Sequence, residues 1–277
     1  MENRPIGIFD SGYGGLTVLK EVAHLLPQYD YLYLGDNARS PYGTRSFQSV
    51  YAYTRECVFK LFDEGCPLVI LACNTASAKA LRTIQQKDLP KMDSSLRVLG
   101  VIRPTAEVIG NYSATGKVGV LGTAGTVMSN SYPMEIGKTF PHVEVYQQAC
   151  PMWVPLIENN EHLGAGADFF VKKYVDQLME KAPGIDSILL GCTHYPLLMD
   201  KIKQHVSENV SIVSQGEIVA ASLKDYLHRH PEMEHSCSKG GSRRFLTTDD
   251  TNVFDKQASV FFGGEVGSEF CSIPHVG

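Results

Sequence analysis

Short apolar runs alternate along the chain with longer amphipathic stretches. Four runs are mostly apolar and predict buried strands, at residues 6–9, 31–34, 68–71 and 118–121. The longer stretches carry apolar residues at helical spacing and predict helices at residues 16–26, 47–64, 76–86, 167–181 and 195–208. Because strands that alternate with helices form parallel sheets covered by helices, the pattern predicts an α/β fold.

A weak internal repeat relates the two halves of the chain. Each half contains an apolar run that leads into a hydroxyl residue and a glycine-bearing turn, at residues 6–12 and 118–125. Later in each half, an apolar run leads directly into a cysteine and a polar residue, at residues 69–75 and 188–194. A recurring order of local features indicates a repeated structural unit. The sequence therefore predicts two similar parallel-sheet α/β domains related by pseudo-symmetry.

Two segments have the character of crossings between these domains. Residues 98–104 lead into the second domain, and residues 210–216 lead back into the first. We therefore expect a discontinuous first domain of residues 1–97 plus 211–277 and a second domain of residues 98–210. Ligands of open parallel sheets bind beyond the carboxyl ends of the strands, where the turns and cysteines of the repeat fall. We expect the active site in the cleft between the domains.

Charge and composition exclude several classes of partner. The 277 residues carry a formal net charge of −5 with scattered basic residues, so we expect no nucleic-acid partner. No apolar run approaches the length of a membrane span, and residues 1–5 lack the features of a secretory signal, so we expect no membrane association. Seven cysteines at irregular spacing favour free thiols in a reducing compartment, which predicts a cytoplasmic protein.

Cys73 and Cys192 are the foremost candidates for chemistry. Each follows a predicted buried strand and precedes a helix, where amide dipoles favour the thiolate. An isolated cysteine is more often a small buried hydrophobe, which is our interpretation of Cys57, Cys66 and Cys271. Packing does not require a thiol at both equivalent points of a repeat. We therefore expect Cys73 and Cys192 to act as acid and base.

The other thiols and the glycine run have simpler interpretations. We expect Cys150 to be structural and Cys237, in the polar loop of residues 234–242, to be a solvated thiol. No Cys-x-x-Cys or His-x-x-x-His spacing occurs, so we expect no metal site. The glycine run at residues 12–15 lacks the spacing of a dinucleotide fingerprint, so we expect no nucleotide there.

Charged side chains near the two thiols suit proton transfer. Asp10 is a candidate to assist Cys73, and His194 a candidate to assist Cys192. Glu158, which follows an apolar stretch, is a third candidate catalytic residue. The alternatives are a turn-capping Asp10, a core or surface His194 and a solvated helix-end Glu158.

Uncharged donors and backbone N–H groups in the same segments suit a substrate carboxylate. The candidate substrate-binding residues are Asp10, Ser11, Tyr42, Gly43, Asn74, Thr75, Thr123, Thr193 and His194, with Thr126 as a neighbour. Helix capping is the alternative for each hydroxyl or amide, although capping does not exclude ligand contact.

Four motifs together resemble the bacterial glutamate racemase family. They lie at residues 9–16 (FDSGYGGL), 35–43 (GDNARSPYG), 72–76 (ACNTA) and 191–196 (GCTHYP). Their order and the segments at 151–158 and 247–249 also fit, so the resemblance spans almost the whole chain. It departs at Ser40, where a cysteine is common, and at Met152 and Trp153.

The resemblance implies interconversion of L- and D-glutamate without a cofactor, for peptidoglycan synthesis, by a cytoplasmic and often dimeric enzyme. It implies that Cys73 and Cys192 are the acid and base, assisted by Asp10 and His194, on opposite faces of the substrate Cα. An aspartate or hydantoin racemase, or a noncatalytic module that binds an acidic amino acid, are the alternatives. A thiol–disulfide oxidoreductase is disfavoured because residues 73–76 hold no second cysteine.

Overall fold

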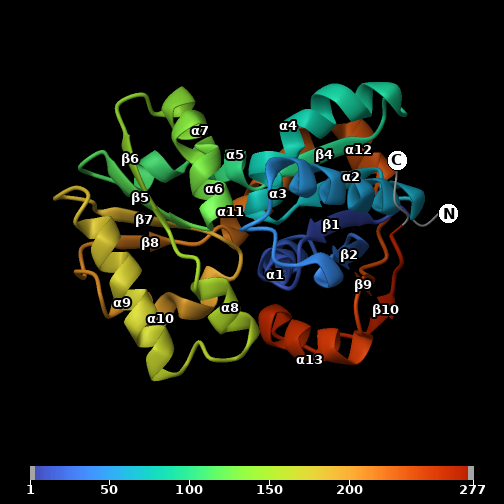
Figure 1. Ribbon diagram of the computed structural model, residues 1–277. Coiled ribbons are helices and arrows are strands. Elements are labelled where there is room, and N and C mark those ends of the chain that lie inside the picture. Colours follow the sequence, from blue (N-terminus) through green and yellow to red (C-terminus); the bar gives the residue numbers. More distant parts are fainter. Residues whose placement is uncertain (1–3, 274–277) are drawn as a thin grey trace.

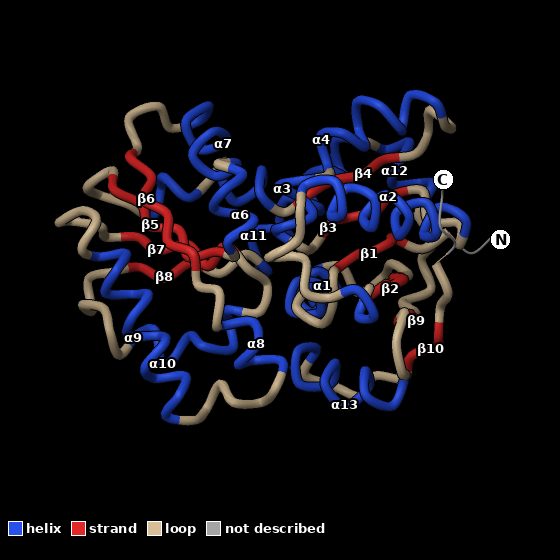
Figure 2. The backbone as a smooth tube through the Cα atoms, viewed as in Figure 1, coloured by secondary structure: helices blue, strands red, loops and turns tan. Residues whose placement is uncertain are grey.

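The computed structural model describes residues 4–273, and its strands form two parallel sheets (Figures 1 and 2). The first has the order β10-β9-β2-β1-β3-β4, from Ser268–Phe270, Arg243–Thr247, Tyr31–Gly35, Ile6–Asp10, Leu68–Leu71 and Arg97–Gly100. The second has the order β6-β5-β7-β8, from Glu144–Ala149, Lys117–Gly122, Ser187–Gly191 and Ser211–Val213. All pairs are parallel, which confirms the predicted α/β class.

The two sheets repeat one arrangement of four strands. In the first sheet β1 lies between β2 and β3, and β4 follows β3; in the second, β5 lies between β6 and β7, and β8 follows β7. Every residue of β1, β2, β3 and β7 is buried, as expected for central strands covered on both faces. The predicted pseudo-symmetry is thus present in the strand order, and β9 and β10 extend the first sheet alone.

Helices cover both sheets and fill the space between them (Figure 1). Those packed with the first sheet are α1 (Gly15–Leu25), α2 (Phe47–Asp63), α3 (Asn74–Lys79), α4 (Leu81–Thr83), α11 (Gly216–Arg229), α12 (Pro231–Ser236) and α13 (Thr251–Phe262). The others are α5 (Ile102–Ala106), α6 (Ala124–Ser129), α7 (Ser131–Thr139), α8 (Trp153–Glu158), α9 (Ala165–Met179) and α10 (Met199–Lys203). One buried apolar cluster includes residues from both sheets, such as Ile8 and Leu190, so the two units share a core.

Two predicted helices differ from the structure. The stretch at 76–86 is helical but divided into α3, α4 and a π-helical turn at Ile84–Asp88. The stretch at 195–208 begins as a 3₁₀ turn at Tyr195–Leu198 and continues as α10, which ends at Lys203. Pro196 lies in the first turn, where its missing N–H costs nothing, but the apolar spacing beyond residue 203 does not continue the helix.

The division into domains at 97/98 and 210/211 remains a proposal. Near these boundaries, β4 pairs with β3 in the first sheet and β8 pairs with β7 in the second. The outermost residues of the proposed first domain, 1–3 and 274–277, lie outside the described residues.

The prediction for Cys237 was wrong. Its side chain is only 4% exposed and belongs to the main apolar cluster. The polar sequence around it hides a short helix, α12, which turns Met233 and Cys237 inward. Cys57, Cys66 and Cys271 are buried, as predicted.

Candidate active site

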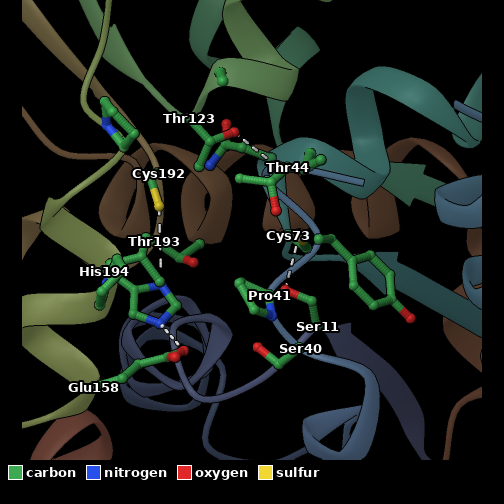
Figure 3. A pocket seen from close by; sticks show the side chains of 18 of the residues that line it. Ser11, Ser40, Pro41, Thr44, Cys73, Thr123, Glu158, Cys192, Thr193 and His194 are labelled. Atoms are coloured by element: carbon green, nitrogen blue, oxygen red, sulfur yellow. Dashed lines mark hydrogen bonds and ion pairs between the residues drawn. The ribbon is translucent and has the colours of Figure 1, made fainter. Parts of the chain in front are cut away.

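A cavity of about 80 Å³ lies where the carboxyl ends of the two sheets meet (Figure 3). One water needs about 10–15 Å³ of cavity volume, so this cavity has room for about five to eight waters. A small metabolite is of that size. Every residue predicted for catalysis or substrate binding lines it: Asp10, Ser11, Tyr42, Gly43, Cys73, Asn74, Thr75, Thr123, Glu158, Cys192, Thr193 and His194. The structure therefore brings residues from β1, β3, β5 and β7 into one place.

Cys73 lies between the end of β3 and the start of α3. Its Sγ caps α3 by accepting from the N–H of Ala76 at 3.5 Å, and it lies 3.5 Å from Ser11 Oγ. The side chain is 6% exposed. Burial, followed by the charge of Asp10, raises the pKa of the Cys73 thiol to about 12. Cys73 is therefore a thiol at neutral pH.

Cys192 enters the cavity from the other sheet, at the end of β7 (Figure 3). Its Sγ lies 3.9 Å from His194 Nδ1, and His194 Nε2 lies 2.9 Å from Glu158 Oε1. Burial lowers the pKa of His194, but its hydrogen bonds to Cys192 and Glu158 outweigh that effect and leave this pKa well above 6.5. A protonated His194 thus lies between the Cys192 thiol and the Glu158 carboxylate.

Asp10, the last residue of β1, has one satisfied and one free carboxylate oxygen. Oδ1 accepts from the N–H of Gly12 at 2.9 Å, whereas buried Oδ2 has no hydrogen-bond partner. Burial raises the pKa of the Asp10 carboxyl, and the positive charge of His194 offsets part of that effect. Asp10 makes no hydrogen bond to Cys73; that contact comes from Ser11. An unpartnered buried oxygen at a cavity suits a cationic ligand group.

Hydroxyl groups form the wall between the two sheets. Thr75 Oγ1 and Thr123 Oγ1 are 2.9 Å apart, and Thr123 also caps α6 by accepting from the N–H of Thr126. Thr126 is fully buried behind this pair. Capping and position at the cavity therefore coexist in Thr123.

The segment at 40–44 closes another side of the cavity. The hydroxyl of Tyr42 donates to Asp36, so the tyrosine ring anchors the segment and leaves its backbone for the cavity. Gly43 accepts from the N–H of Gly125 at 2.8 Å, and a Cβ at Gly43 would lie 3.0 Å from Thr123. The backbone here thus approaches the second sheet closely.

Sequence reasoning missed a buried amide network behind Asn74. Asn74 Nδ2 donates to Gln215 Oε1 at 2.6 Å, and Asn74 Oδ1 accepts from the hydroxyl of Tyr132 at 2.6 Å. Gln215 Nε2 in turn donates to the carbonyl of Val101 and the hydroxyl of Thr105. The side chain of Asn74 is therefore committed to the protein, and its backbone N–H, at the first residue of α3, has no partner within the helix.

The three residues that depart from the family motifs lie in different surroundings. Ser40 lines the cavity. Met152 is 38% exposed, whereas Trp153 is fully buried and packs edge-on against Tyr195 at 4.7 Å, beneath the Cys192 segment. Cys150, predicted as structural, is buried but also lines the cavity.

Residues 4–273 contain neither a metal-binding cluster nor a membrane-spanning helix. No group of three or more His, Cys, Asp or Glu side chains is placed to hold a metal ion within that range. None of the helices described there is both long and apolar enough to cross a bilayer.

The cavity with its two thiols agrees with the protein family that the sequence matches. The family model for Asp/Glu/hydantoin racemases matches residues 15–223. The chain belongs to the Asp/Glu/hydantoin racemase family. Members of this family invert a stereocentre, so the protein is an isomerase.

Relatives within the racemase family match over nearly their full length. A glutamate racemase of Roseobacter denitrificans is 43% identical over 266 residues, covering 92% of this chain and 96% of the relative. A glutamate racemase isoform of Bacillus anthracis has a similar structure, with a TM-score of 0.89 and 33% identity over 99% of both chains. The glutamate racemase of Francisella tularensis, solved with D-glutamate, gives a TM-score of 0.87 and 31% identity over 99% of both.

Proposed function

We propose that this protein is a cofactor-independent glutamate racemase that interconverts L- and D-glutamate by two-base proton transfer between Cys73 and Cys192. One observation carries the proposal: two thiols enter a single cavity from equivalent positions of two sheets. Inversion at Cα needs a base on one face and an acid on the other, and this pair supplies both.

The surroundings of the two thiols assign their resting roles. Cys192, beside protonated His194, starts as thiolate, and Cys73 starts as thiol. The Cys192 thiolate takes the proton from Cα, the electron pair of the C–H bond passes into the substrate carboxylate, and Cys73 delivers its proton to the opposite face. When the enantiomer leaves, Cys192 is the thiol and Cys73 is the thiolate. The reverse direction uses the exchanged state.

Groups around the thiols supply what the carbanion needs. Preorganised donors lower the energy of charge that develops on a substrate carboxylate. We assign this role to the hydroxyls of Ser11, Thr123 and Thr193 and to the backbone N–H groups of Asn74 and Thr75, the first residues of α3. The free oxygen of Asp10 suits the substrate ammonium group.

Within the same proposal, Glu158 holds His194 in its protonated form, and the segment at Tyr42 and Gly43 closes the cavity.

We further propose a cytoplasmic homodimer that supplies D-glutamate for peptidoglycan. All seven cysteines are free, which suits a reducing compartment.

Circular dichroism of L-glutamate incubated with the purified protein tests the proposal. The signal is expected to decay to zero after dialysis against a chelator and without pyridoxal phosphate. Parallel incubations with L-aspartate and hydantoins test the related racemases. A stable glutamate signal with bound ligand would instead identify a binding module, and faster decay of another substrate would reassign the specificity.

Replacement of each thiol tests the mechanism. Cys73→Ala and Cys192→Ala are each expected to abolish racemisation in both directions, because each variant lacks a proton donor or acceptor on one face. Cys66→Ala, which removes a buried thiol that does not line the cavity, is the matched control for thiol loss. Full activity in either cavity variant would refute the two-base assignment.

A further inference from the structure

The glycine run at residues 12–15 contacts the catalytic segment of the other sheet. A Cβ added at Gly14 would lie 2.3 Å from Thr193 Oγ1 and 2.4 Å from His194 Nδ1. Both separations are far shorter than any van der Waals contact. Gly14 therefore lies directly against the pair of residues that follows Cys192.

Space, and not backbone conformation, requires glycine at this position. Gly14 has φ −57° and ψ −37°, which any L-residue adopts without strain. A substitution by alanine would therefore leave the backbone unstrained and add only one methyl group. That methyl would meet Nδ1 of His194, the same atom that faces Cys192 Sγ at 3.9 Å.

The remaining sides of His194 are already occupied. Nε2 bonds to Glu158, and the ring of Phe261 in α13 packs edge-on at 5.2 Å. The backbone of the segment is also fixed, because the hydroxyl of Thr17 in α1 donates to the Thr193 carbonyl at 3.0 Å. The imidazole thus has no free direction in which to yield without losing a contact.

We propose that Gly14 is a positioning residue for racemisation, whose missing side chain lets the His194 imidazole lie in line between Glu158 and Cys192. This inference rests on the proposed function. It gives the glycine run a role other than nucleotide binding: Gly14, the residue before α1 on the side of the first sheet, supports His194 on the side of the second.

A methyl group at residue 14 changes the charge environment of one thiol more than that of the other. The charged groups around His194 are Glu158 from α8, Asp10 from β1 and the Cys192 thiolate. Displacement of the imidazolium removes the cation nearest to Cys192. Cys73 hydrogen-bonds Ser11 and Ala76 and is linked to His194 only through Asp10, so its surroundings change less.

Thiol alkylation in Gly14→Ala tests this inference without turnover. Iodoacetamide labelling, followed by mass spectrometry of the two cysteine peptides, gives a rate for each thiol against pH. The alkylation rate of Cys192 at neutral pH is expected to fall about tenfold, because less thiolate is present. The same fall is expected in His194→Ala. The Cys73 rate is expected to change by less than about threefold, because His194 reaches Cys73 only through Asp10. An unaltered Cys192 profile, or equal losses at both thiols, would overturn the proposal.

Steady-state kinetics on the same variant give the second readout. A displaced acid–base group is expected to lower kcat about 10- to 100-fold while KM changes by less than about threefold. Gly137→Ala is the matched control, because nothing lies within 4 Å of its added Cβ. If wild type proves inactive on glutamate, the proposed function fails. The labelling result still shows whether Gly14 positions His194 beside Cys192.

A double variant keeps the test decisive if Gly14→Ala folds poorly. With His194→Ala the contact on the imidazole side of residue 14 is removed and only the one with Thr193 Oγ1 remains, so adding Gly14→Ala should cost less activity than it costs wild type. Equal costs in both backgrounds would contradict a role through His194. Thermal melting of all variants shows whether any loss reflects unfolding.

Discussion

At the scale of single residues, the two thiols are distinguished by their surroundings. Cys73 is a buried thiol beside the carboxylate of Asp10, whereas Cys192 faces protonated His194. A resting enzyme with one thiol and one thiolate is what a two-base racemase needs, since the pair must always contain one acid and one base. The asymmetry arises from neighbours, because the two cysteines occupy equivalent places in the repeat.

The pH dependence of Cys73 labelling follows from its raised pKa. A thiol with a pKa of about 12 is almost wholly protonated near neutrality, and its thiolate fraction rises about tenfold per pH unit. Alkylation of Cys73 in the Cys192→Ala variant is therefore expected to accelerate about tenfold per unit from about pH 7.5 to about pH 9.5. A rate that levels off below about pH 9 would show that burial and Asp10 do not suppress the thiolate.

At the scale of elements, what the sequence could predict depended on local contacts. The strands before Cys73 and Cys192 are short apolar runs whose ends mark the site, so both the sheets and the cavity residues were predictable. The Asn74–Gln215 hydrogen bond joins residues 141 positions apart, and no local sequence pattern predicts it. Tyr132 and Gln215 were missed for that reason, and Cys237 was misplaced because a polar loop concealed α12.

The amide network behind Cys73 is expected to stabilise the fold. Tyr132→Phe leaves the buried Oδ1 of Asn74 without its donor, whereas Gln215 Nε2 keeps Val101 and Thr105 as acceptors. The loss should lower the free energy of unfolding by about 1–3 kcal/mol. Urea denaturation measures the loss. Tyr146→Phe, whose hydroxyl bonds an exposed Glu144, is the control and should leave stability unchanged. Equal stability of the Tyr132→Phe protein and wild type would show that the network contributes nothing.

At the scale of the whole molecule, the site exists only where the two sheets meet. Asp10 and Cys73 come from the first sheet, and Cys192 and His194 come from the second. Contacts such as the one between Gly14 and His194 fix their relation, and the shared apolar cluster holds the two units together. A ligand that touches both sheets should therefore stabilise the assembled protein.

Glutamate binding should raise the thermal stability of the full chain. At about 100 times Kd, a ligand that binds only the folded state adds about 2.7 kcal/mol to the free energy of unfolding. Differential scanning fluorimetry with L- and D-glutamate is expected to show an increase with either enantiomer, and lysine should give none. A melting temperature independent of glutamate would contradict a site built from both sheets.

Proton origin in the first turnovers tests the central claim most directly. Wild type is incubated with L-glutamate in D₂O, and the D-glutamate formed at low conversion is separated and analysed by mass spectrometry. Two thiols on opposite faces predict deuterium at Cα of the D-glutamate, while the remaining L-glutamate keeps its original proton. D-Glutamate that retains the substrate proton would show that one base returns it to the other face, and would contradict the account.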